Sequence, residues 1–122
     1  MKLYTNYVLF AIIVFLIDMI YIFSISNYFK KVIKRVQKTP LYLNKIGAAV
    51  CYLVITLGMY YFIIMKKAPL VDAFLLGLFV YGVFELTNYA LFHHWDITTI
   101  IIDTIWGGIL FTSSTYTYRL LI

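Results

Sequence analysis

Acidic side chains interrupt three of the four long apolar runs of this chain. Asp18 lies in the first run, Glu85 deep in the third and Asp103 in the fourth. A charged residue at the centre of a membrane-spanning helix costs roughly 2.5 to 3.5 kcal/mol, so such groups usually face the protein interior and serve protons, ions or ligands. If the runs span a membrane, these residue types indicate proton or cation chemistry.

Helical spacing places further polar side chains beside the acids. Tyr81 and Asn88 lie four and three positions from Glu85, so they share its helix face, and Trp106 is three positions from Asp103. With a rise of about 1.5 Å per residue, Glu85 and Asp103 lie roughly 10 Å from one side of the membrane, and Asp18 roughly 15 Å from it. We therefore predict one polar cluster at the bundle axis, open toward that side. It comprises Asp18, Tyr21, Lys45, Tyr52, Tyr81, Glu85, Asn88, Asp103 and Trp106.

The charge of this cluster limits its chemistry. Three acids against one lysine, Lys45, leave excess negative charge in a poorly solvated place, so at least one carboxyl should hold a proton unless a cation is bound. The alternative interpretation is that these groups only hydrogen-bond the helices to one another.

The elements that position these residues follow from composition. The chain has 122 residues, of which 64% are hydrophobic and 12% charged, outside the range of soluble domains. A spanning helix needs about 20 apolar residues, and a backbone in lipid must satisfy its own hydrogen bonds. We predict one all-α domain over residues 1–122, a bundle of four transmembrane helices at about 3–28, 46–65, 70–92 and 97–120. Small residues should let the helices pack closely at Gly77, Gly107 and Gly108.

Only the connection from residue 29 to 45 is long. Phe29, Val32, Ile33 and Val36 recur there at helical spacing between basic residues, which predicts a short basic interfacial helix or, equally, an extension of the first helix. Its exposed cations should meet anionic lipid head groups, and the net charge of +5 indicates a membrane surface rather than nucleic acid. The residues concerned are Lys30, Lys31, Lys34 and Arg35.

The distribution of basic residues predicts the orientation. This connection side carries six lysines and arginines, from Lys30 to Lys45, and the opposite side four: Lys2, Lys66, Lys67 and Arg119. Basic loops tend to stay in the cytoplasm, so we expect the connection to be cytoplasmic and both termini on the other side. Asp96 should cap the fourth helix.

The residues of the polar cluster resemble a family of small four-span membrane proteins, mostly bacterial with viral relatives, catalogued as domain of unknown function 2177. The likeness covers nearly the whole chain. It rests on Asp18, Lys45, the run from Tyr81 to Ala90, Trp95 and the run from Asp103 to Gly107. Glu85 stands where the family more often has aspartate, and Phe84 where it has tyrosine. The resemblance implies the fold but no activity.

Three functions fit the sequence. The first is proton or cation transport through the carboxylates, with Asn88 and Tyr81 orienting them, Lys45 tuning their protonation and a homo-oligomer providing room for a path. The second is a lipid head-group binder or enzyme, with Lys45 and the basic connection holding a phosphate. The third is a structural or accessory bundle. No phosphate loop, metal-ligand spacing or nucleophile motif is present, so we expect no cofactor, metal or nucleic acid, and an enzyme is not favoured.

Overall fold

The computed structural model describes residues 2–38 and 44–122, and these residues form helices joined by short turns. The elements are α1 (Lys2–Gln37), α2 (Lys45–Met59), the π-helical segment η1 (Tyr60–Met65) that continues α2, α3 (Leu70–Leu91) and α4 (Ile97–Leu121). α1, α2 with η1, α3 and α4 are each long and apolar enough to cross a membrane. The predicted all-α fold class is therefore confirmed.

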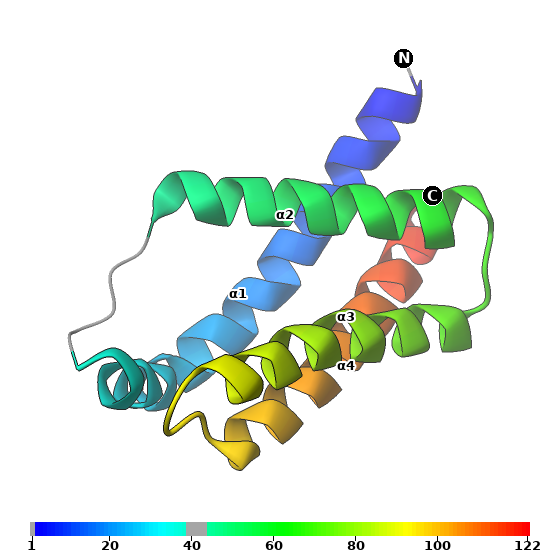
Figure 1. Cartoon of the computed structure of the whole chain (residues 1–122). Coiled ribbons are helices and arrows are strands. Elements are labelled where there is room, and N and C mark those ends of the chain that lie inside the picture. Colours follow the sequence, from blue (N-terminus) through cyan, green and yellow to red (C-terminus); the bar gives the residue numbers. More distant parts are fainter. Residues whose placement is uncertain (1, 39–43) are drawn as a thin grey trace.

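The start of α1 and the end of α4 lie on the side of the turn between η1 and α3, whereas the end of α1 and the turn between α3 and α4 lie on the opposite side (Figure 1). Below, the first is called the termini side and the second the basic side.

Side chains and backbone geometry mark the helix ends. The Asn44 side chain accepts a hydrogen bond from the Gly47 backbone N–H at 3.0 Å and starts α2. Asp96 accepts from the Thr98 backbone N–H at 3.0 Å and starts α4, which confirms the predicted cap. Lys38 and Lys67 take positive φ values of 65° and 52°, the left-handed conformation that commonly follows a helix.

The basic residues after position 29 belong to α1 itself. α1 runs unbroken for 36 residues, so the separate interfacial helix is wrong and the extension of the first helix is the interpretation that holds. Its last turns run in a different direction from the rest (Figure 1, cyan). The hydroxyls of Ser24 and Ser26 donate to the backbone carbonyls of Ile20 and Phe23, and such bonds commonly bend helices.

The second span is not a uniform α-helix. Its last turns, η1, follow the wider π pattern, and the Ala68 N–H donates to the Ile63 carbonyl five residues back at 2.9 Å. This geometry buries both Tyr60 and Ile63.

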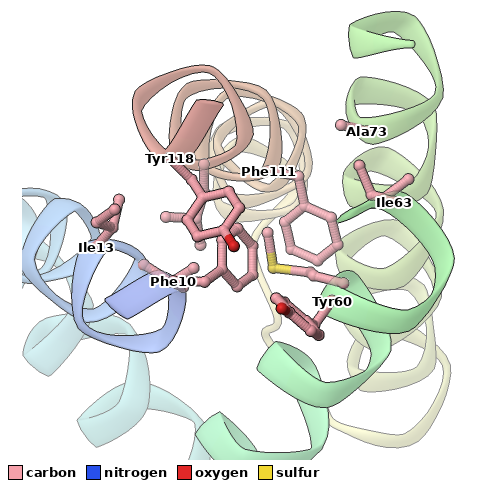
Figure 2. Packing of buried hydrophobic residues seen from close by; sticks show 10 residues of the cluster. Phe10, Ile13, Tyr60, Ile63, Ala73, Phe111 and Tyr118 are labelled. Carbon is pink, nitrogen blue, oxygen red and sulfur yellow. The ribbon is translucent and has the colours of Figure 1, made fainter. Parts of the chain in front are cut away.

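The apolar core lies toward the termini side and joins all of the helices. Phe10 from α1, Tyr60 from η1, and Phe111 and Tyr118 from α4 converge there, with Ile63 and Ala73 beside them (Figure 2). The ring centroids of Phe10 and Tyr118 are 5.4 Å apart, edge to face. This packing fills the interior of the bundle between the acids and the termini side.

α3 and α4 touch along their backbones. A Cβ built on Gly77 would lie 2.1 Å from the Gly107 carbonyl oxygen, and one on Gly108 2.7 Å from the Phe74 ring. The predicted small residues therefore stand where the two helices are closest. This spacing determines how near α3 and α4 hold Glu85 and Asp103.

Candidate functional site

The three intramembrane acids are all buried, from three different helices. Asp18 of α1 is 6% exposed, Glu85 of α3 is 0% exposed and Asp103 of α4 is 8% exposed. Acids are almost never buried this far without partners. Their partners therefore define the site.

Asp18 accepts hydrogen bonds from two other helices. The Tyr52 hydroxyl of α2 donates to its Oδ2. The indole Nε1 of Trp106 in α4 donates to its Oδ1 at 2.9 Å. One carboxyl thus joins α1, α2 and α4.

Asp103 is held from α1. The Tyr21 hydroxyl donates to its Oδ1. The Tyr21 ring stacks on the indole of Trp106, with centroids 4.5 Å apart and planes 4° from parallel. The partner of Asp103 therefore packs against the partner of Asp18, and the two halves of the site are in contact.

Glu85 has one oxygen with a hydrogen-bond donor and one without. Trp95 donates from its Nε1 to Oε2 at 2.7 Å, whereas Oε1 is buried with no hydrogen-bond partner among residues 2–38 and 44–122. The Asp103 carboxyl lies close enough to Glu85 for the two to share a hydrogen bond when one of them carries a proton; two ionised carboxylates have no proton to donate. Tyr21 joins Asp103 to Trp106, the donor to Asp18, so the three acids belong to one set of contacts.

Two predicted members stand apart from these contacts. Lys45 is exposed at the first residue of α2, and no ion pair joins it to an acid in the described part of the chain. Asn88 is half-buried, with no side-chain hydrogen bond to another described residue. The lysine is displaced because it lies at the end of a helix that meets the bundle mainly further along, at Thr56 and Met59.

Tyr81 supports the cluster through packing. Its ring meets the Phe111 ring edge to face, with centroids 6.2 Å apart, and a Cβ on Gly107 would lie 2.5 Å from its Cγ. Its hydroxyl is in electrostatic range of Asp18 and Asp103. Tyr81 thus lies beside the acids without a hydrogen bond to them among the described residues.

Trp95 was not included in the predicted cluster. Its side chain is 7% exposed and holds Glu85. Two signals pointed to it: the family resemblance, which includes Trp95, and its place after the turn that follows Glu85. Which way its indole points depends on how the α3–α4 turn folds back on the bundle.

A second polar group, also not predicted, lies nearer the basic side. The Tyr28 hydroxyl of α1 donates to Asp96 Oδ2 at 2.8 Å and is 2.9 Å from the Thr99 Oγ1. It fastens the late turns of α1 to the start of α4.

The chemistry that this arrangement allows is narrow. The groups that contact the acids are tyrosine hydroxyls and indole N–H groups, which donate hydrogen bonds without bringing positive charge. In the described ranges, no group of three or more His, Cys, Asp or Glu residues is placed to hold a metal ion. The acids are therefore held by neutral hydrogen-bond donors.

The fold and the comparisons together place the chain among small helical membrane proteins. It belongs to the family described as Predicted membrane protein (DUF2177), whose model matches residues 3–119. The resemblance seen in the sequence is thereby confirmed. No curated protein and no solved structure matches the chain.

Proposed function

We propose that the carboxyl cluster takes up and releases a proton, and that the protein uses this exchange to move protons, or cations in exchange for them, across the membrane. The observation that supports the proposal is the convergence of Asp18, Glu85 and Asp103 with neutral partners only. Buried charges without a counter-charge are costly, and a bound proton removes one of them.

The free oxygen of Glu85 is where the proton would be exchanged. Trp95 occupies Oε2, so Oε1 is the atom left to share a proton with the Asp103 carboxyl. A proton on one carboxyl and a lone pair on the other satisfy both groups, as in other closely placed acid pairs.

Tyr21 is suited to connect the two halves of the site. A phenol both donates and accepts hydrogen bonds, whereas an indole only donates. Trp106 can therefore hold Asp18 but cannot pass a proton on, whereas the Tyr21 hydroxyl that donates to Asp103 can also accept. In this scheme the Tyr21 hydroxyl holds Asp103 while its ring packs on the Trp106 indole that holds Asp18, so a change of protonation at Asp103 is transmitted to Asp18 through these contacts.

The closed ends of the site favour a carrier over an open pore. The aromatic core around Phe10 and Tyr118 fills the termini side, and Trp95 and Phe29 pack over the other side, where an opening was predicted from the sequence. Transport then requires the two ends to open in turn. We further propose that the four helices each cross the bilayer as one domain, with the basic side in the cytoplasm and both termini opposite. The chain would assemble into a homo-oligomer.

Proton flux into proteoliposomes tests this function. With a pH gradient imposed and a pH-sensitive dye inside, the wild type should carry protons faster than protein-free liposomes. Glu85→Gln and Asp103→Asn, which keep the shape but cannot release a proton, should fall to the protein-free rate. Asp72→Asn is the matched control, because Asp72 is an exposed acid in the first turn of α3 and should not matter.

Proton flux is compared only among variants whose circular dichroism shows the helix content of the wild type. Flux that persists in Glu85→Gln and Asp103→Asn would contradict the proposal. A wild type that carries no protons, combined with variants that lose only stability, would instead favour an assembly role for the cluster.

A further inference from the structure

The last turns of α1 expose a group of cations that the carboxyl cluster does not use. Lys30, Lys31, Lys34 and Arg35 are all exposed within six consecutive positions. No acid in the described part of the chain forms an ion pair with any of them, although Asp96 lies in electrostatic range of Arg35. We call these four residues the basic face.

The opposite side of the same turns is held firmly against the bundle. Val32 is fully buried, and the Phe29 ring meets the Trp95 ring edge to face with centroids 6.5 Å apart. Tyr28 adds the hydrogen bonds to Asp96 and Thr99. The basic face therefore points outward already in the unbound protein.

The length of α1 decides where this face lies. Its 36 residues make a helix of about 54 Å, whereas the hydrocarbon core is only about 30 Å thick. The last turns must leave the core, and they bend away from the axis of the span (Figure 1). A bent, amphipathic end that is continuous with a spanning helix lies at the level of the lipid head groups.

We infer that the basic face binds the phosphate head groups of anionic lipids in the adjoining leaflet. The four cations point outward at the depth of the lipid head groups, where lysine side chains extend toward phosphates. The partner is therefore a bilayer surface. Lipid binding also stabilises the last turns of α1, which pack on Trp95. It therefore reduces local opening of the segment that covers Glu85. The inference does not depend on proton transport.

Lipid selectivity measures this binding directly. The full chain is reconstituted in phosphatidylcholine bilayers with trace spin-labelled phosphatidylglycerol or phosphatidylcholine, and the protein-bound fraction of each label is compared. The wild type should prefer phosphatidylglycerol. Lys30 and Lys31 are then replaced by glutamine. Each replacement should lower this preference by up to about fivefold, which corresponds to about 1 kcal/mol per cation.

A second pair of adjacent lysines provides the matched control. Lys66 and Lys67 are also exposed and follow one another, but they lie on the termini side. Lys66→Gln with Lys67→Gln should leave most of the preference, and Lys30→Arg with Lys31→Arg should keep it. Equal losses in the two glutamine pairs, or no preference in the wild type, would overturn the inference.

Two further measurements separate the lipid surface from other anions. Inorganic phosphate added at constant ionic strength should leave the preference unchanged, and its loss would mean a phosphate pocket and overturn the assignment to lipid. Hydrogen exchange over residues 28–37 should slow when phosphatidylglycerol is added to the bilayer. Unchanged exchange in the wild type would contradict the fastening of these turns.

Discussion

Gly107 lies where α4 touches α3, and its replacement by alanine tests the contact that positions Glu85 beside Asp103. A Cβ at this position would lie 2.5 Å from Tyr81 Cγ and 2.6 Å from the Gly77 carbonyl oxygen. Ordinary contact begins near 3.4 Å, so the helices must separate by about 0.8 Å at the carbonyl. The end of a flexible side chain could move aside, but the carbonyl of Gly77 belongs to the backbone of α3 and moves only with the helix.

The expected magnitude is obtained by comparison with a second glycine. A Cβ added to Gly58 would have no atom within 4 Å, so Gly58→Ala should show only the gain in helix propensity, at most about 1 kcal/mol. Gly107→Ala has the same gain but also the overpacking cost, typically about 1–3 kcal/mol. The difference between the two variants should therefore be about 1–3 kcal/mol in the free energy of unfolding, with Gly107→Ala the less stable.

Reversible unfolding provides the measurement. Both variants and the wild type are titrated with dodecyl sulfate in dodecylmaltoside micelles, and helicity is followed by circular dichroism. Gly77→Ala, with its 2.1 Å approach to the Gly107 carbonyl oxygen, should be at least as unstable as Gly107→Ala. If Gly107→Ala proves as stable as Gly58→Ala, α3 and α4 do not meet along their backbones, and this contact does not position Glu85 beside Asp103.

Two further predictions concern the orientation in the membrane and the Asp96 carboxylate. In a Cys51→Ala background, Lys38→Cys should react with a membrane-impermeant maleimide from the cytoplasmic side and Lys67→Cys from the other side; the reverse pattern would contradict the proposed orientation. The pKa of Asp96 is lowered because its carboxylate accepts hydrogen bonds from the Tyr28 hydroxyl and the Thr98 backbone N–H. A lowered pKa means that this carboxylate stabilises the fold above its unfolded value of about 3.9, and the contribution is lost as pH falls through the folded value. The free energy of unfolding of Asp96→Asn, measured by titration at a series of pH values, should lack this decrease at acid pH. If the variant loses stability in acid as steeply as the wild type, Asp96 is not the source of the decrease.

The sequence by itself determined the four apolar helices, the Asp96 cap and the helix faces that carry the acids. These features depend on local properties: hydropathy over about 20 residues, and the period of about 3.6 residues that brings Glu85 and Tyr81 to one face. A helix in lipid has to satisfy its own backbone, so little else competes with these signals.

The tertiary structure alone decided which partners meet across helices. Trp95 turned inward to Glu85, Lys45 stayed exposed, α1 continued through its basic turns, and the end of the second span became π-helical. The rotation of each helix about its axis and the depth at which it crosses its neighbours are determined by side-chain packing and by the Gly77–Gly107 approach. Those quantities arise from pairs of residues far apart in the chain, and a local pattern does not encode them.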